Sequence, residues 1–269
     1  MVRVLSAAVL AALVVATIWA LPMWATAALA ALAAMAAGVE FAHLSTRIGA
    51  AVPASFVGLA SSALAIAFVI YERRVPGSDD DSLGAVLLAL LVIAGTVALA
   101  LGPPTPHTVT RAAVMVMAPV YIGLPLGAIA WVQWVFGPAA TTWLIATIAC
   151  SDSAQYYTGR AFGRTKLAPA VSPAKTNEGA IGGLLAACVL GVIVGPMCLT
   201  GMSHAAGGVI GLVLAMFGIA GDLFESLLKR GAGAKDASAL IPGHGGVLDR
   251  IDALLFAAPV FYLFLRYFA

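Results

Sequence analysis

One polar stretch stands out in the sequence: SLLKRGAGAKDASALIPGHGGVLDRID, from Ser226 to Asp252. The helix expected to lead into it carries Asp222, Glu225, Ser226 and Lys229 at positions i, i+3, i+4 and i+7, which places them on one helical face. Charged groups inside an apolar helix are costly and usually face a polar cavity or a partner. These residues therefore indicate a functional site, and the alternative is a structural ion pair between Asp222 and Lys229.

The following helix is expected to begin near Gly246, and its first turns carry Asp249 and Asp252 with Arg250 between them. Carboxylates near a helix N-terminus are favourable to the helix dipole, so capping is the alternative for either aspartate alone. Oxygen ligands of this kind suit Mg²⁺, which usually takes one or two carboxylates plus substrate phosphates.

The loop between these helices is rich in glycine, including Gly245 and Gly246. Glycines let a backbone approach a ligand closely, and successive exposed N–H groups can cradle anionic oxygens. Cations that would neutralise phosphate lie at its start: Lys229, Arg230 and Lys235. His244 is either a proton donor to a leaving phosphate or a plain hydrogen-bond donor held between glycines.

A second polar loop runs from Asp152 to Gly179. Its cations are Arg160, Arg164, Lys166 and Lys175, and its hydroxyls include those of Ser172 and Thr176. One interpretation is a basic flank that binds anionic lipid headgroups. The sharper hypothesis is a phosphate-binding loop that folds over the same cavity as the first polar loop.

Several catalytic motifs are absent from the sequence. GRAFGRTK does not have the spacing of a P-loop, and neither an H-E-x-x-H motif nor a Ser-His-Asp or Cys-His constellation is evident. Carboxylates, cations and glycines without a protein nucleophile fit phosphoryl or nucleotidyl transfer, where positioning and charge stabilisation supply most of the catalysis.

The composition indicates what positions these residues. The 269 residues are 62% hydrophobic and 10% charged, whereas soluble domains are about half apolar and about a quarter charged. We predict an all-α, polytopic integral membrane protein, because a span needs about 20 apolar residues. About nine spans are expected, near residues 4–21, 25–43, 51–71, 84–101, 112–136, 139–158, 179–199, 205–227 and 251–268. The first is interpreted as a retained helix, and a signal peptide is the alternative.

The positive-inside rule predicts the orientation of these spans. With a cytoplasmic N-terminus, most of the 14 Lys and Arg residues fall on the cytoplasmic side, and Arg73, Arg74 and Arg266 fall outside. Both polar loops then face the cytoplasm, as expected for an enzyme of the cell inner (plasma) membrane. We divide the chain into N-terminal helices over 1–138 and a C-terminal catalytic region over 139–269.

The C-terminal motifs resemble the signature of the phosphatidate cytidylyltransferases, the CDP-diacylglycerol synthases. The resemblance rests on Ser226-x-x-Lys229-Arg230-x4-Lys235-Asp236 and on Pro242-Gly243-His244-Gly245-Gly246-x-x-Asp249-Arg250-x-Asp252. It extends to Asp222, Glu225 and the LAPAVSPAKTNEG segment of the second loop, and so covers roughly residues 150–269. Asn177 and Ala174 depart from the family pattern, in which an aromatic residue and a lysine are expected.

The resemblance implies that CTP and phosphatidic acid give CDP-diacylglycerol and pyrophosphate, with Mg²⁺ required. We hypothesise that Asp222 and Asp249 hold the metal. Asp236 and Asp252 are expected to orient the neighbouring cations, with the role of metal ligand as the alternative for either. Catalytic or phosphate-neutralising roles fall on Lys229, Arg230, Lys235, Asp236, His244 and Arg250. Substrate-binding roles fall on Arg160, Ser172, Lys175, Thr176, Ser226, Gly245 and Gly246. A homodimer in contact with membrane lipids is expected, no nucleic-acid partner is expected, and a second, monovalent cation stays open.

Three other activities remain open. A CTP-dependent polyprenol kinase would leave CDP instead of pyrophosphate, and a transporter would spread its charges along a transmembrane path. A CDP-alcohol phosphatidyltransferase is disfavoured because its D-G-x-x-A-R core is absent. Glu40 is unexplained: it can pair with His43, line a lipid entrance, or lie near the membrane surface.

Overall fold

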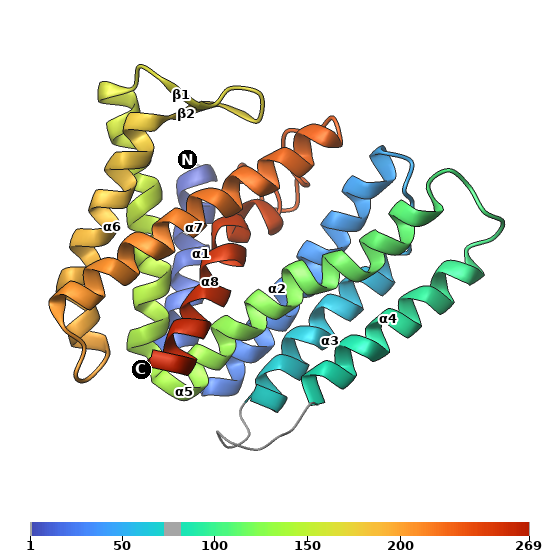
Figure 1. The fold of residues 1–269 in the computed structure, drawn as a ribbon, viewed down its shortest axis with the longest axis horizontal. Coiled ribbons are helices and arrows are strands. Elements are labelled where there is room, and N and C mark those ends of the chain that lie inside the picture. The colour runs from blue at the N-terminus through green and yellow to red at the C-terminus, as the bar shows by residue number, and fades with distance from the viewer. Residues whose placement is uncertain (1, 73–81, 269) are drawn as a thin grey trace. The chain divides into compact units, whose positions relative to one another are not determined.

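The computed structural model describes residues 2–72 and 82–268 of the chain, and these residues are mainly helical (Figure 1). Arg73 and Arg74, which bear on the expected membrane orientation, lie outside the described residues. The helices are α1 (Val2–Trp19), α2 (Met23–Arg47), α3 (Ala54–Glu72), α4 (Ser82–Ala100), α5 (Thr108–Phe162), α6 (Asn177–Cys198), α7 (His204–Gly231) and α8 (Leu248–Phe268). The strands are β1 (Lys166–Ala168) and β2 (Ser172–Thr176).

The helices follow the apolar runs of the sequence. Within the described residues, seven of them, α2 to α8, are long and apolar enough to cross a membrane, and α1 contributes a shorter apolar helix over Ser6–Trp19. Helices of this length satisfy the backbone hydrogen bonds of their central residues internally, which the interior of a bilayer requires. The predicted all-α, polytopic membrane architecture is therefore confirmed.

The expected count of nine spans is not confirmed, because the spans at 112–136 and 139–158 form one 55-residue element, α5. Gly137 interrupts the helical backbone of α5 with φ 79° and ψ −172°. A glycine adopts positive φ without a steric penalty. The chain therefore changes direction at a single residue instead of through a separate loop, and so the two expected helices are joined.

The chain divides into two compact units, which are described separately. The first unit comprises residues 1–135 and 231–250, and the second comprises residues 136–230 and 251–269. The expected division into N-terminal helices over 1–138 and a catalytic region over 139–269 is functional, not a division by packing, and it stays a prediction.

In the first unit, α2 and α3 lie side by side, and α4 packs against α3 (Figure 1). Glycines allow the close approach of α2 and α3: a Cβ on Gly38 would lie 3.0 Å from the Cα of Gly58. The ring of Phe41 packs edge-on against Tyr121 of α5. The N-terminal helices thus form a packed platform, on which the loop of residues 231–250 is held by hydrogen bonds described below.

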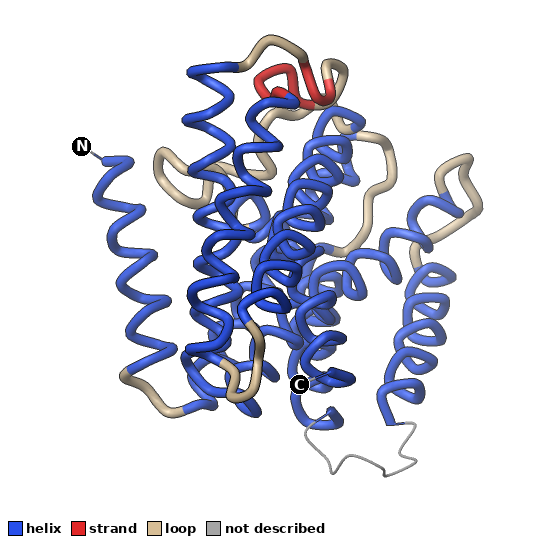
Figure 2. Tube along the Cα trace, turned by 60° about the vertical axis from the view of Figure 1, so that its left-hand side comes forward, coloured by secondary structure: helices blue, strands red, loops and turns tan. Residues whose placement is uncertain are grey.

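In the second unit, α6 and α7 pack through small residues. A Cβ on Gly211 would lie 2.2 Å from the carbonyl oxygen of Ala187, and a Cβ on Gly207 would lie 2.3 Å from that of Gly191. Trp143 of α5 packs edge-on against Phe261 of α8, and both side chains are fully buried. The antiparallel hairpin β1–β2, red in Figure 2, lies next to the start of α6 (Figure 1).

Candidate active site

The second polar loop forms a hairpin that leads directly into α6. Thr176 is the N-cap of α6, and its Oγ1 accepts a hydrogen bond of 3.1 Å from the N–H of Gly179. Glu178 fastens the other end of the hairpin, because its carboxylate accepts hydrogen bonds from the N–H of Arg164 and from the hydroxyl of Thr165. The cap and the carboxylate fix β2 against the start of α6.

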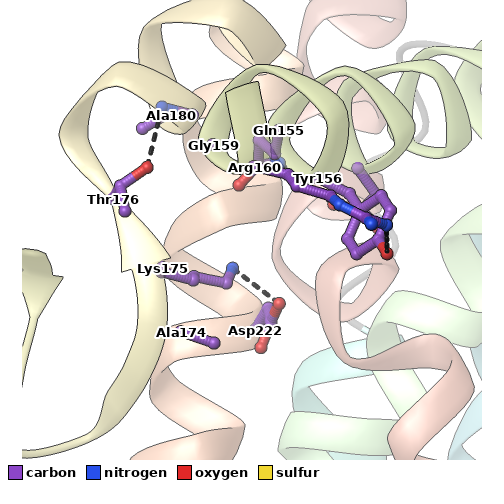
Figure 3. Close-up of a pocket in the computed structure, with 11 residues that line it drawn as sticks. Gln155, Tyr156, Gly159, Arg160, Ala174, Lys175, Thr176, Ala180 and Asp222 are labelled. Atoms are coloured by element: carbon purple, nitrogen blue, oxygen red, sulfur yellow. Dashed lines mark hydrogen bonds and ion pairs between the residues drawn. The ribbon is translucent and has the colours of Figure 1, made fainter. Parts of the chain in front are cut away.

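A cavity of about 430 Å³ opens beside this hairpin in the second unit (Figure 3). Residues of α5, β2, α6 and α7 line it: Asp152, Gln155, Tyr156, Gly159, Arg160, Ala174, Lys175, Thr176, Gly179, Ala180 and Asp222. Three predicted substrate-binding residues, Arg160, Lys175 and Thr176, therefore share one cavity with the predicted metal ligand Asp222. Neither Arg164 nor Lys166 lines it, so the structure separates the four cations of the loop into two pairs.

Lys175 and Asp222 form an ion pair in this cavity, with 2.6 Å between Nζ and Oδ2 (Figure 3). Asp222 also accepts a hydrogen bond of 3.3 Å from Ser226 on the next turn of α7. Arg230, at the end of α7, donates from Nε to the carbonyl oxygen of Val171 in the hairpin turn. The hairpin is thus tied to α7 at two points.

The alternative ion pair between Asp222 and Lys229 is not what the structure shows. Lys229 pairs with Glu225 one turn earlier on α7. Both side chains are buried, and that of Glu225 is fully enclosed. Lys229 is therefore held within the helix bundle, while Asp222 is directed towards the hairpin.

Asp252 belongs to the same electrostatic neighbourhood. The charges of Asp222, Lys229 and Asp152 act on its carboxyl group. Its Oδ1 accepts a hydrogen bond of 2.8 Å from the N–H of Ala253. Three carboxylates, on α5, α7 and α8, therefore influence one region of the second unit.

Ser172 lies at the start of β2 in the second unit and is not among the residues that line the cavity. The remaining predicted residues lie in the first unit, in the loop of residues 231–250. Asp249 closes this loop: both of its oxygens accept from the N–H of Ala237, and Oδ2 also accepts a hydrogen bond of 2.7 Å from the N–H of Gly246. Gly245 has φ 78°, and a Cβ there would lie 2.7 Å from Oδ2 of Asp249. The capping alternative for Asp249 is thus seen directly. The charged side chains exposed on this loop are those of Lys235, Asp236 and Arg250.

Glu40 of α2 has hydrogen-bond partners far away in the sequence. Its carboxylate accepts hydrogen bonds from the hydroxyl of Ser238 at 2.7 Å, from the N–H of Val247 at 3.0 Å and from the N–H of Leu248 at 2.8 Å. Its partners are therefore in the loop of residues 231–250 and not His43, and it is not a carboxylate that needs no partner. The expected role of lining a lipid entrance stays a prediction. The only sequence signal was a carboxylate inside an apolar helix, which calls for a partner without identifying it.

His244 is anchored by α1. Its Nδ1 lies 2.8 Å from Oγ of Ser6, and the same hydroxyl donates to the carbonyl oxygen of Pro242. The imidazole is therefore part of a hydrogen-bond network, which agrees with the second of the two roles considered for it and leaves acid catalysis untested.

The carboxylates of the cavity suit a metal ion that binds together with a phosphate ligand better than one held by protein side chains alone. Across residues 2–72 and 82–268, no three His, Cys, Asp or Glu side chains are close enough to hold an ion together. Asp152 and Asp222 do open into the same cavity. Because Mg²⁺ is usually bound through one or two carboxylates plus substrate phosphates, this donor set fits a magnesium-nucleotide complex.

Comparison with known proteins adds independent information. The model of the cytidylyltransferase family matches residues 1–268. A phosphatidate cytidylyltransferase of Haemophilus influenzae is 48% identical over 123 residues, covering 42% of this chain and 41% of that protein. One of Helicobacter pylori is 40% identical over 143 residues, covering 51% of each.

An uncharacterized protein of Escherichia coli, YnbB, is 44% identical over 131 residues, covering 49% of this chain and 44% of that protein. The chain spans about half the length of the curated relatives it matches.

Proposed function

The chain belongs to the cytidylyltransferase family, and from this premise we propose that it is a phosphatidate cytidylyltransferase. CTP and phosphatidic acid would give CDP-diacylglycerol and pyrophosphate. The observation that carries the proposal is the cavity of the second unit, where the cations Arg160 and Lys175 face the carboxylates Asp152 and Asp222. Relatives at 48% and 40% identity that are named phosphatidate cytidylyltransferases support it.

The reaction needs little protein chemistry. An oxygen of the phosphatidate phosphate forms a bond to the α-phosphorus of CTP, and the bond from that phosphorus to the β-bridging oxygen breaks as pyrophosphate leaves. The attacking oxygen is already ionised near neutral pH, so no general base is required. Catalysis then consists of holding two polyanions together and neutralising the charge of the transition state.

Within the cavity, Lys175 and Arg160 are proposed to bind phosphate oxygens. Thr176 and Ser172 would keep β2 and the start of α6 in place around the nucleotide. Lys235, Asp236, His244, Arg250 and the backbone N–H groups near Gly245 keep, as proposals, the catalytic and substrate-binding roles predicted for them from the sequence. Lys229 and Ser226 are proposed to fix the face of α7 that presents Asp222.

Mg²⁺ is proposed as the cofactor, and it would neutralise the triphosphate and favour departure of pyrophosphate. Asp222 is its proposed ligand in the cavity, with Asp252 as a neighbour. Asp249 remains a proposed ligand, although its oxygens accept three backbone hydrogen bonds.

We also propose that the protein lies in the cell inner membrane with the cavity on the cytoplasmic side. The support is the cluster of cations between Arg160 and Lys175, which the positive-inside rule assigns to the cytoplasm. CTP is available in that compartment. The homodimer and the monovalent cation expected from the resemblance stay predictions.

The test is turnover by the purified protein in lipid nanodiscs. With CTP, Mg²⁺ and phosphatidic acid, we expect equal amounts of pyrophosphate and CDP-diacylglycerol. Lys175→Ala should lower kcat/KM strongly, whereas Lys166→Ala, which removes an exposed cation from the same hairpin outside the cavity, is the matched control. Formation of CDP with a polyprenol acceptor would point to a kinase, and no turnover with either acceptor would reject both assignments.

A further inference from the structure

Glu40 lies inside the first unit, 3% exposed, on a helix that contributes no residue to the proposed cavity. A carboxylate withdrawn from water is costly unless it is hydrogen-bonded or paired. Glu40 has such partners, and they all lie in the distant loop of residues 231–250, which includes Leu248, the first residue of α8.

The contacts of Glu40 are directed at backbone as well as side chain. Oε1 accepts from Ser238 and from the N–H of Val247, and Oε2 accepts from the N–H of Leu248. Leu248 begins α8, where the first N–H groups have no partner within the helix. Glu40 therefore serves as an N-terminal cap for α8 that is supplied by another helix.

Gly246 shows how closely the loop is seated on this carboxylate. A Cβ on Gly246 would lie 2.5 Å from Oε2 of Glu40, which is closer than two such atoms can approach. The N–H of Gly246 is bound by Asp249, so the backbone of residues 246–248 is held from two sides. Glu40 and Asp249 together fix the ends of the segment that carries His244.

We propose that Glu40 is a positioning residue for the reaction: it holds the loop of residues 231–250 in the conformation that presents its charged side chains to substrate. This inference rests on the proposed function. It also assigns a purpose to the N-terminal helices, because α2 supplies Glu40 and α1 supplies Ser6, which binds His244. The loop's fold is thus determined by residues about 200 positions earlier in the chain.

The test compares Glu40→Gln with Ser45→Ala in nanodiscs. Glutamine has the same shape but keeps one acceptor oxygen, so its amide group would face a backbone N–H donor. Ser45 is the matched control, because it is also buried in α2 and its hydroxyl binds the carbonyl oxygens of Ala42 and Ala50, away from the loop. The readouts are kcat and KM for both substrates, and hydrogen exchange of the loop peptides measured by mass spectrometry without substrate.

For Glu40→Gln we expect kcat/KM to fall at least about tenfold and exchange to rise in peptides covering residues 237–248, with α2 and α3 unchanged. Glu40→Asp should recover part of both effects, and Ser238→Ala, which removes one of the three contacts, should give a smaller change in the same direction. Unchanged loop exchange would overturn the inference. So would a rise spread equally over α2 and α3, or full activity despite a loosened loop. If the wild type lacks the proposed activity, the exchange measurement still decides whether Glu40 holds the loop.

Discussion

Lys175 on the hairpin and Asp222 on α7 face one another across the cavity, with 2.6 Å between the ammonium nitrogen and the carboxylate oxygen. Both side chains are largely shielded from solvent, with exposed fractions of 18% and 27%. Before a nucleotide binds, each charge is therefore balanced by the other. A magnesium-bound triphosphate offers an anion to Lys175 and a cation to Asp222, so we expect the pair to separate on binding.

The first prediction concerns Asp222. Asp222→Asn should lower kcat/KM about 100-fold or more, because an oriented charge in a shielded site contributes several kcal/mol to the transition state. If Asp222 binds the metal, the remaining activity should need more Mg²⁺ than the wild type. The measurement is a magnesium titration of CDP-diacylglycerol formation, with removal of all divalent cations by EDTA as the zero point.

Asp152→Asn is the comparison for Asp222→Asn, because Asp152 lines the same cavity and is not the partner of Lys175. We expect a smaller loss of activity from it. Equal magnesium requirements in the wild type and in Asp222→Asn would remove the metal assignment while leaving the cavity assignment intact.

The second prediction concerns Asp249, which accepts backbone hydrogen bonds from Ala237 and Gly246. Asp249→Asn should destabilise the protein by about 1–3 kcal/mol, since an amide group would face a buried N–H donor. Thermal unfolding of the purified protein without Mg²⁺ measures this effect. An unchanged unfolding midpoint together with a raised magnesium requirement would instead favour the metal-ligand role.

The third prediction separates two roles of Thr176. Thr176→Ser keeps the hydroxyl that caps α6 and should retain activity and stability. Thr176→Ala removes the acceptor for the N–H of Gly179 and should cost about 0.5–2 kcal/mol of stability. Thermal unfolding and turnover are measured on both variants. A Thr176→Ala protein of normal stability and low turnover would show that the hydroxyl acts on substrate rather than on the helix.

The fourth prediction concerns the contact of α6 with α7. Gly211→Ala places a methyl group 2.2 Å from the carbonyl oxygen of Ala187, so the helices must move apart. Such overpacking costs about 1–3 kcal/mol. Gly95→Ala in α4 is the control, because a Cβ there meets nothing within 4 Å. We expect the unfolding midpoint to be lower in Gly211→Ala than in the wild type, and not to be lowered in Gly95→Ala. Equal midpoints in the two variants would contradict the close packing of α6 and α7.

Most of the helices of this protein could be predicted from the sequence. Long apolar runs have one stable arrangement in a bilayer, so α2 to α4 and α6 to α8 lie near the expected spans. The kink at Gly137 was not predicted, because a glycine inside an apolar run is compatible with a loop, a kink or a straight helix. The hairpin β1–β2 was also missed, since a short polar segment with prolines carries little strand periodicity.

The cavity was predicted in part for the same kind of reason. Residue type marked Arg160, Lys175 and Asp222, because cations and carboxylates are rare in so apolar a chain. Local spacing did not identify the partner of each charged side chain. Lys229 forms an ion pair with Glu225, and Asp222 forms one with Lys175. The partners of Glu40 lie about 200 residues away, which no helical periodicity can reveal.

That separation has a consequence for how the protein is made. Ser238, Val247 and Leu248 are synthesised 198 to 208 residues after Glu40. At a synthesis rate of about 5–20 residues per second, the hydrogen-bond donors of Glu40 are made about 10–40 s after the carboxylate itself. During this interval α2 carries an acid inside its apolar sequence without its native partners, so nascent chains that stop short of residue 238 should be recognised and degraded more readily than chains that reach residue 250.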